Sequence, residues 1–205
     1  SSIQGTWDTI NTEYLNVIIA SGFIGIFLGD TLLFMALQRI GPRRNNILFS
    51  LAAPFTIILN IVVLQKNMNF IEISGCVLVF LGVVIAITYG DSKNKNYHRW
   101  ELIQGSIKIG ILCAIFAALC HAIGLIMMKP ILNEGADPIA SAAIRTSISA
   151  FLLSFTFFYK TNLKNIDMIF KPNIIIKTII SGFLGMALGM SLLLIALQNA
   201  DAGIV

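Results

Sequence analysis

The sequence is poor in charge: only 12% of its 205 residues are Asp, Glu, Lys or Arg. Soluble domains carry about 25% charged residues. With 57% hydrophobic residues and a mean hydropathy of +0.85, the chain is not expected to fold in water. The net charge is only +4, and the basic residues lie in connecting segments rather than on one face. A nucleic-acid partner is therefore not expected.

Other scarcities exclude further classes of protein. Five prolines and no polar low-complexity tract argue against disorder. The three cysteines, Cys76, Cys113 and Cys120, lie inside apolar runs, where we expect small buried side chains. They form no CxxC or Cys/His spacing, so neither a metal site nor a cofactor is expected. Residues 1–14 are polar and have no basic segment, so they do not resemble a signal peptide.

Long apolar runs dominate what is present. The core of a bilayer requires about 20 apolar residues of helix, and continuous runs of this kind are helices because an open strand cannot span lipid. We therefore predict an all-α integral membrane protein with a bundle of six transmembrane helices. The six predicted spans are Leu15–Gln38, Ile47–Leu64, Ile71–Tyr89, Ile107–Met128, Pro138–Tyr159 and Ile174–Leu197.

A seventh helix is predicted to begin at Asp201–Val205. The chain does not begin with Met and stops within an apolar segment, so we expect it to be a fragment of a longer protein.

One stretch occurs twice. Ser21–Ile40 returns as Ser181–Ala200 at an offset of 160 residues, with eleven of twenty positions identical. The copies fall on the first and sixth predicted helices, so each repeat is five helices long. An odd number places the two copies in opposite orientations across the membrane, as in many secondary transporters. The longest polar linker, Gly90–Gly105, predicts the boundary between two partial repeats, 1–90 and 91–205.

Each copy carries a stripe of small residues on one helix face, including a GxxxG motif. In lipid, small residues let helix backbones approach closely, so we expect these glycines to serve helix packing. The alternative is that they let helices slide during transport. The glycines are Gly22, Gly25 and Gly29 in the first copy, and Gly182, Gly185 and Gly189 in the second.

Asp30 lies near the middle of the first predicted helix, and its counterpart in the second copy is Met190. An ionised Asp at that depth costs about 3 kcal/mol on insertion scales, so it should face a cavity or a partner. It could contact a substrate amine or couple transport to protons. The alternatives are a structural ion pair or a hydrogen bond between helices.

Arg145, His121 and Asn60 are the other polar candidates at membrane depth. Arg145 could bind an anionic group of a substrate, pair with Asp30 or extend to the lipid headgroups. His121 could relay protons or, more commonly for a lone histidine, pack through a hydrogen bond. We take these three residues and Asp30 as candidate cavity residues. Pro54 is expected to kink the second helix.

The pattern GxxGxxxGDxxxFxAL, followed by a turn and a Pro-containing helix, resembles the drug/metabolite transporter superfamily, in its EamA-like branch. Arg145 stands where members often carry an Arg. The resemblance covers the whole chain. The residues that carry it are Gly22, Gly25, Gly29, Asp30, Phe34, Ala36, Leu37, Pro54, Gly75 and Gly82, then Gly182, Gly185, Gly189, Ala196 and Leu197.

The resemblance implies a ten-helix transporter of two inverted five-helix repeats, in which this chain holds helices three to eight and the start of nine. Such proteins move small metabolites, often outward, by alternating access through a central cavity. Two features depart from the family. Gln65-Lys66 replaces a Gly-Glu found in many members. The basic loops 39–44, 90–108 and 160–177 conflict with the family topology under the positive-inside rule, so the orientation stays open.

The predicted function is therefore a secondary exporter of small metabolites, not an enzyme, in the plasma (inner) membrane. The expected partners are a small-molecule substrate and the lipid bilayer, with a proton as coupling ion and a homodimer as further hypotheses. One alternative is an intramembrane enzyme, but a rhomboid-type protease would need a GxSG motif, which the sequence lacks. The other is a non-transporting scaffold, which would not need an inverted repeat.

Overall fold

The computed structural model describes residues 12–65, 70–89, 105–160 and 172–199. The predicted seventh helix at Asp201–Val205, most of the linker between the two predicted repeats, and Lys66 lie outside these residues. The described part is helical. Its elements are α1 (Thr12–Ser21), η2 (Gly22–Leu28), α2 (Gly29–Phe49), α3 (Ala52–Leu64), α4 (Phe70–Tyr89), α5 (Ile107–Asn133), α6 (Pro138–Lys160), α8 (Pro172–Gly182), η4 (Phe183–Gly189) and α9 (Met190–Asn199).

The first repeated stretch forms one long helix, α1–η2–α2, with a π-helical section in its middle. The amide of Gly29 donates to the carbonyl of Ile24, five residues earlier, which is the hydrogen-bond spacing of a π-helix. The helix breaks at Gly41, where φ is 77° and ψ is 166°. Side chains with a Cβ rarely adopt this conformation, so the glycine permits the break directly before Pro42.

The second predicted span, Ile47–Leu64, is not one helix. Its first residues belong to the end of α2, and α3 begins only at Ala52. The chain between them makes a tight turn, in which the amide of Leu51 donates to the carbonyl of Leu48. Pro54 follows in the first turn of α3, where a missing amide hydrogen is readily tolerated. The regular helical hydrogen bonding is therefore interrupted at residues 50–51, and the expected kink at Pro54 stays a prediction.

The fourth predicted span, Ile107–Met128, ends too early, because α5 continues through Pro130 to Asn133. The helix ends where Gly135 adopts a φ of 100°. The amide of Ala136 there donates to the carbonyl of Ile131, which is the hydrogen bond of a Schellman cap. Asp137 then begins α6 by accepting the amides of Ile139 and Ala140 at 2.7 and 3.0 Å.

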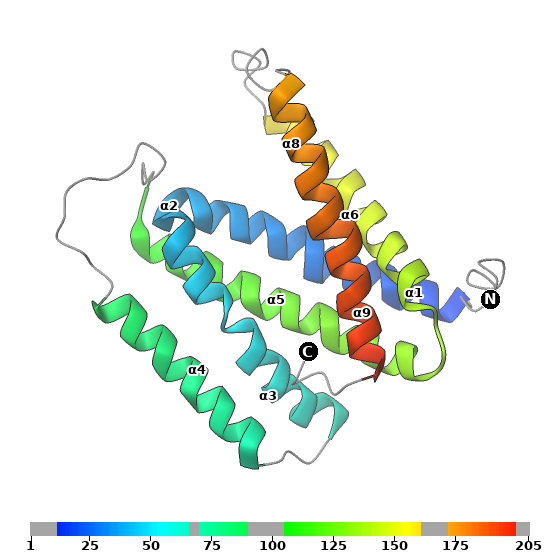
Figure 1. Cartoon of the computed structure of the whole chain (residues 1–205), viewed down its shortest axis with the longest axis horizontal. Helices are drawn as coiled ribbons and strands as arrows, with labels where there is room; N and C mark the ends of the chain where they lie inside the picture. Colours follow the sequence, from blue (N-terminus) through cyan, green and yellow to red (C-terminus); the bar gives the residue numbers. More distant parts are fainter. Residues whose placement is uncertain (1–11, 66–69, 90–104, 161–171, 200–205) are drawn as a thin grey trace.

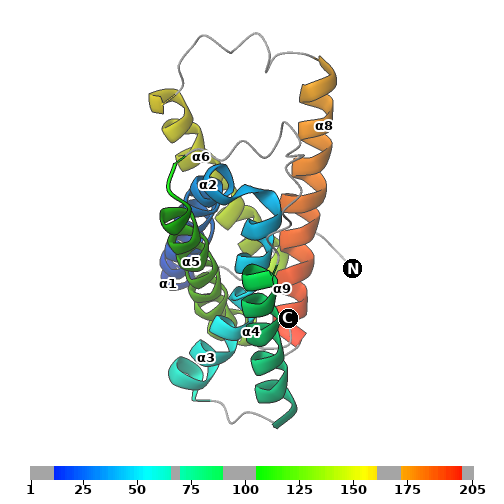
Figure 2. The ribbon, with the colours of Figure 1, turned by 90° about the vertical axis from the view of Figure 1, so that its left-hand side faces the viewer.

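The second repeated stretch also forms a long helix, α8–η4–α9, and it too has a π-helical section, displaced by one residue from that of the first copy. Figure 1 shows the α1–α2 helix lying alongside α5, with the α8–α9 helix crossing steeply over this pair. In the view of Figure 2, α3 and α4 lie near one end of the molecule and α8 extends toward the other.

Two groups of buried apolar side chains hold the helices together. The first joins Ile18 of α1, the carboxyl-terminal half of α5, and Leu194 and Leu197 of α9. The second joins α2, α4 and the amino-terminal half of α5 around Ala36, Ile40 and Val83. The first group contains the beginning of one repeat copy and the end of the other. The start of the first copy therefore lies close to the end of the second copy.

Four helical segments among the described residues are long and apolar enough to cross a bilayer: Tyr14–Phe49, Ile107–Asn133, Pro138–Phe155 and Ile175–Asn199. Two of the six predicted spans are shorter. The 13 residues of α3 reach only about 20 Å at 1.5 Å per residue, against about 30 Å for the core of a bilayer. The apolar part of α4, Ile73–Ala86, is also short. The chain is thus an all-α membrane protein, and four of its described helical segments have the length and composition of a membrane span.

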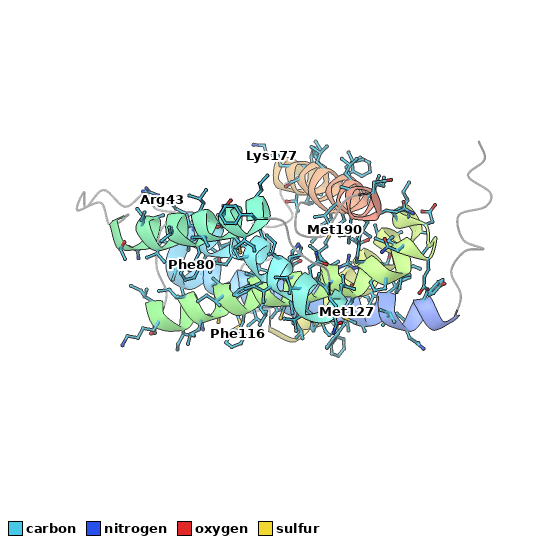
Figure 3. The ribbon with its side chains drawn as sticks, turned by 90° about the horizontal axis from the view of Figure 1, so that it is seen from below. Arg43, Phe80, Phe116, Met127, Lys177 and Met190 are labelled. Atoms are coloured by element: carbon cyan, nitrogen blue, oxygen red, sulfur yellow. The ribbon has the colours of Figure 1, made fainter. Side chains whose placement is uncertain are left out.

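Large apolar side chains cover much of the outer surface, as expected for contact with lipid. Phe80 of α4 is 56% exposed, and Phe116 of α5 is 53% exposed and points away from the bundle (Figure 3). Water-soluble proteins rarely present so much exposed apolar surface.

Candidate functional site

The candidate site lies where η2 crosses α5 and α6. We call it the glycine crossing and define it by Gly22 and Gly25 of η2, Gly124 of α5, and Arg145 of α6. A Cβ built on Gly25 would come within 3.0 Å of the Cα of Gly124, and one built on Gly22 within 3.1 Å of the carbonyl oxygen of Arg145. Both distances are tighter than nine in ten real Cβ contacts. The absence of side chains therefore lets the three helices meet backbone to backbone.

Arg145 places its guanidinium in this crossing and is only 1% exposed. One of its terminal nitrogens would lie 3.3 Å from a Cβ added at either Gly25 or Gly124. The two glycines thus make the space that the guanidinium occupies. None of the three guanidinium nitrogens has a hydrogen-bond partner. An arginine presents five N–H donors, so the crossing holds a buried cation whose hydrogen-bonding capacity is unused.

Two alternatives for Arg145 are excluded by this geometry. It does not pair with Asp30, because neither the guanidinium nitrogens nor the buried Oδ2 of Asp30 has a partner. It does not extend to the lipid headgroups, because its side chain is enclosed by protein. Binding of an anionic group is the remaining prediction for this residue.

His121 of α5 lies beside the guanidinium of Arg145 and the backbone of Gly25. On its other side, the imidazole packs against the ring of Phe49, with ring centroids 5.4 Å apart and an interplanar angle of 59°. The structure therefore brings together two of the predicted cavity residues, His121 and Arg145, from two different helices.

Two serine hydroxyls form hydrogen bonds between helices at the glycine crossing. Ser21 donates to the carbonyl of Gly124 at 2.7 Å, and Ser149 donates to the carbonyl of Gly22 at 3.0 Å. Both serines are buried, with 0% and 1% of their surface exposed. A π-helical section leaves backbone groups without their regular partners, and functional sites often contain one. Here the Ser149 hydroxyl bonds the carbonyl of the first π-helical residue.

Neither Asp30 nor Asn60 forms a hydrogen bond with the guanidinium of Arg145. Asp30 follows Gly29, whose nearest neighbours are on α5 at Ala117 and Cys120. Its Oδ2 is buried and unpartnered, as is Oδ1 of Asn60 in α3, a residue only 4% exposed. The four predicted cavity residues therefore form one close pair and two separate buried polar positions, all near α5 or the helices packed on it.

The glycines of the second copy have a different environment. A Cβ added at Gly182 or Gly185 would meet nothing within 4 Å, and one at Gly189 would meet only the carbonyl of Leu184 in its own helix. Within the described residues, these glycines face open surface, whereas Gly22, Gly25 and Gly29 of the first copy face α5 and α6.

Several buried polar residues were not among the predicted site residues. Asn45 and Ser141 are 2% and 0% exposed, and each has an unpartnered oxygen. Lys129 is 5% exposed and donates to the carbonyl of Leu197 at 2.6 Å. Lys129 stands beside a proline and Asn45 beside arginines, a context typical of loops. Ser21 could have been selected from the sequence, because a serine begins both repeat copies, at positions 21 and 181.

No group of three His, Cys, Asp or Glu side chains gathers anywhere in the described helices to hold a metal ion. The three cysteines are free, and Cys113 is buried in the second apolar group. The site therefore offers a cation, an imidazole and isolated oxygen acceptors, which suits binding of a polar solute by hydrogen bonds and charge.

Comparison with known proteins supports a transport role for such a site. The sequence model of the EamA-like transporter family matches residues 2–88 and 108–205. "Solute carrier family 35 member B1" of Xenopus tropicalis is 32% identical over 71 residues, which are 35% of this chain and 22% of that protein. "Uncharacterized transporter YyaM" of Bacillus subtilis (strain 168) is 26% identical over 132 residues, which are 64% of this chain and 41% of that protein.

The matched region thus spans less than half the length of each of these relatives. The 132 aligned residues and their 41% share correspond to about 320 residues in the Bacillus protein, against 205 here. No solved structure matches the chain.

Proposed function

The chain belongs to the EamA-like transporter family, and on that premise we propose that the full-length protein is a secondary transporter that exports small metabolites. It works by alternating access through a cavity between two inverted five-helix repeats, to which residues 1–90 and 91–205 contribute. The inner (plasma) membrane is the proposed location. We propose further that the substrate is a small molecule and that protons are the coupling ion. The protein assembles as a homodimer in this proposal.

One observation carries the inverted-repeat part of this proposal. Ile18, near the start of the first copy, and Leu194 and Leu197, near the end of the second, lie in one buried apolar group. This contact between the start of one copy and the end of the other supports the proposed inverted repeat, as does the odd number of predicted helices in each repeat. A scaffold has no need of such an arrangement, whereas a transporter can exchange the two equivalent halves between outward-open and inward-open states.

The proposed substrate contacts are Asp30, Asn60, His121 and Arg145. Buried polar groups without partners are costly in a membrane protein, and a charged one costs several kcal/mol or more. A substrate or a coupling ion that passes through the cavity supplies the missing partners for part of the cycle.

Transport by the full-length protein tests this function. Cells that express the protein, and cells that do not, are loaded with the same nutrients, and their retained and released metabolites are compared by untargeted mass spectrometry. Compounds that change are then followed in proteoliposomes with and without a pH gradient. If no compound is released faster and none is carried by the liposomes, the protein is not an exporter of small metabolites.

Asp30→Asn tests the site within the same assay. We expect reduced transport with normal insertion into the membrane, because the amide keeps the size of the carboxyl group but removes its charge and its ability to bind a proton. Asp137→Asn is the matched control, since Asn caps a helix about as well as Asp. Unchanged transport by Asp30→Asn would remove this residue from the site while leaving the transporter assignment intact.

A further inference from the structure

Positively charged side chains gather at one end of the α2–α5 pair, and none of them belongs to the proposed transport site. Arg39, Arg43 and Arg44 lie in the second half of α2, and Lys108 lies in the first turn of α5. The end of α2 and the start of α5 are at the same end of the molecule (Figure 1). Glu134 follows the other end of α5. The exposed charges at the two ends of this helix therefore have opposite signs.

Arg39 stands against the first turn of α5. A Cβ built on Gly110 would lie 2.8 Å from the Cβ of Arg39, and one built on Gly105 would lie 3.7 Å from its Nε. One terminal nitrogen of Arg39 donates to the carbonyl of Met35 at 2.9 Å, which uses one of five N–H donors. The side chain is only half-buried, and Lys108, between the two glycines in the chain, is exposed. Two helices thus present cationic groups around one turn of α5.

An apolar stripe continues from this cationic end along α5. Lys108, Leu112 and Phe116 are spaced by four residues, so they lie on one side of the helix. Leu112 is 55% exposed and Phe116 is 53% exposed. The ring of Phe116 points away from the bundle (Figure 3). The outer side of α5 therefore begins with a cation and goes on as an apolar surface.

The length of α5 sets the depth of these residues in the bilayer. Its 27 residues extend about 40 Å, against about 30 Å for the hydrocarbon core. With the helix centred in the bilayer, about 5 Å extends into the headgroup layer at each end. Lys108 then lies at the level of the headgroups, where long cationic side chains are stable. Leu112 and Phe116 lie at the level of the acyl chains.

We propose that Arg39 and Lys108 bind the phosphate of an anionic phospholipid, whose acyl chains lie along Leu112 and Phe116. The guanidinium and the ammonium group both donate charge-assisted hydrogen bonds to phosphate oxygens. Arg43 and Arg44 add positive charge at the same end of the molecule. Basic groups between membrane helices at the bilayer surface are the kind of site that anionic headgroups occupy.

Other occupants match this surface less well. A soluble phosphate compound or an acidic segment of a protein would leave the apolar stripe beside Lys108 uncovered. A zwitterionic lipid would cover the stripe, but it brings a positive group together with its phosphate and has no net charge to offset Arg39 and Lys108. An anionic phospholipid supplies both the negative charge and the apolar chains.

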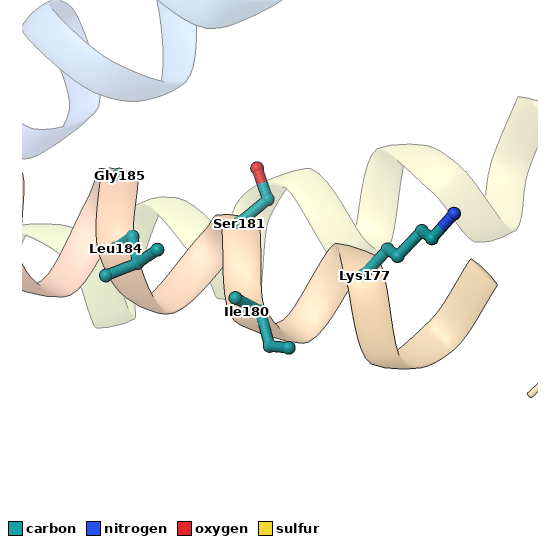
Figure 4. Close-up of a pocket in the computed structure, with 5 residues that line it drawn as sticks. All are labelled: Lys177, Ile180, Ser181, Leu184 and Gly185. Carbon is teal, nitrogen blue, oxygen red and sulfur yellow. The ribbon is translucent and has the colours of Figure 1, made fainter. Parts of the chain in front are cut away.

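Lys177 of α8 provides the contrasting surface cation. It lines a groove of about 580 Å³ together with Ile180, Ser181, Leu184 and Gly185 (Figure 4). These lining residues carry one cationic group, so a phosphate in this groove would meet one cation instead of two. Lys177 is exposed, as Lys108 is, and its substitution therefore makes a matched control.

Lipid binding by the full-length protein tests this site. The purified protein is titrated with phosphatidylglycerol or with phosphatidylcholine of the same acyl chains, and native mass spectrometry counts the lipid molecules that stay bound. We expect the wild type to bind phosphatidylglycerol more tightly. Arg39→Gln and Lys108→Gln should each weaken this binding about fivefold, the effect of one cation near the surface on an anionic lipid. Lys177→Gln should leave it unchanged.

Equal binding of the two lipids by the wild type would overturn the proposal. A loss in Lys177→Gln as large as that in Lys108→Gln would also overturn it, because the attraction would then come from the net charge of the protein. Should Arg39→Gln fail to fold, Lys108→Gln still decides, since its side chain is exposed and packs against nothing that the fold requires.

Competition with glycerol 3-phosphate separates a lipid from a free phosphate compound. We expect millimolar glycerol 3-phosphate to leave phosphatidylglycerol bound, because it lacks the acyl chains that cover Leu112 and Phe116. Displacement of the lipid would show that the site recognises phosphate alone, against the proposal. None of these measurements depends on transport, so the lipid site can fail while the transporter assignment stands.

Discussion

Gly25 of η2 and Gly124 of α5 touch through their backbones. A methyl group built on Gly124 would lie 2.7 Å from the Cα of Gly25, and one built on Gly25 would lie 3.0 Å from the Cα of Gly124. Side chains at either position would push apart the helices that enclose Arg145. The contact therefore links the glycine stripe of the repeat to the buried guanidinium next to it.

Gly124→Ala should destabilise the protein. Its new methyl group meets backbone atoms, which cannot rotate away, so we expect a cost of about 1–3 kcal/mol, as in other overpacked sites. Thermal unfolding in detergent would measure it. Gly82→Ala is the matched control, because nothing lies within 4 Å of a Cβ there. Equal Tm values for the two variants would show that the helices are not in backbone contact.

Arg145→Met should separate stability from function. Methionine has a similar length and no charge, and replacing a buried charge by a well-packed apolar residue is often neutral or stabilising. We therefore expect an unchanged or higher Tm, together with a loss of transport of more than about tenfold, which corresponds to roughly 1.4 kcal/mol. A lower Tm with unchanged transport would indicate that the guanidinium serves the fold alone.

Lys129→Met should weaken the attachment of α9. The ammonium group donates to the carbonyl of Leu197 at 2.6 Å, within the last turn of that helix. The substitution removes a buried hydrogen bond from a charged donor, at a cost of about 1–3 kcal/mol. Lys108→Met, at an exposed position of α5, is the control. Chemical unfolding monitored by circular dichroism compares the pair, and equal midpoints would contradict the expected role.

Gly41→Ala should strain the break between the two parts of α2. A residue with a Cβ at φ 77° and ψ 166° costs about 1–3 kcal/mol. Gly75→Ala, in the helical backbone of α4 with open space around it, should be neutral or mildly stabilising. The difference in Tm between the two variants measures the strain. A Gly41→Ala protein as stable as the control would mean that the chain bends elsewhere.

Helix positions followed closely from the sequence where one apolar run forms one helix, as in α4, α6 and the α8–α9 stretch. The predicted helix boundaries were wrong where a residue type or an apolar run can occur both inside a helix and at its end. Pro130 usually marks a helix end, but here α5 continues past it and ends at a left-handed Gly135. The run Ile47–Leu64 has the composition of one span, yet a turn at residues 50–51 divides it.

The candidate site was predictable in composition but not in arrangement. A lone Arg or His in an apolar run is conspicuous in any sequence, so Arg145 and His121 could be selected from it. Nothing in the sequence showed that they adjoin each other, that Asp30 does not pair with Arg145, or that Lys129 bonds the end of α9. These relationships join residues on different helices, and local sequence carries no record of the distance between helices.

The sequence by itself determined that the chain is an all-helical membrane protein with one stretch present twice, because hydropathy and an internal copy are properties of residue order alone. Only the tertiary structure decided what each copy contacts. Ser21 and Gly25 are covered by α5, whereas the same residue types at Ser181 and Gly185 line an open groove. Burial is a property of a residue's neighbours, so two nearly equal sequences can have different surroundings in one fold.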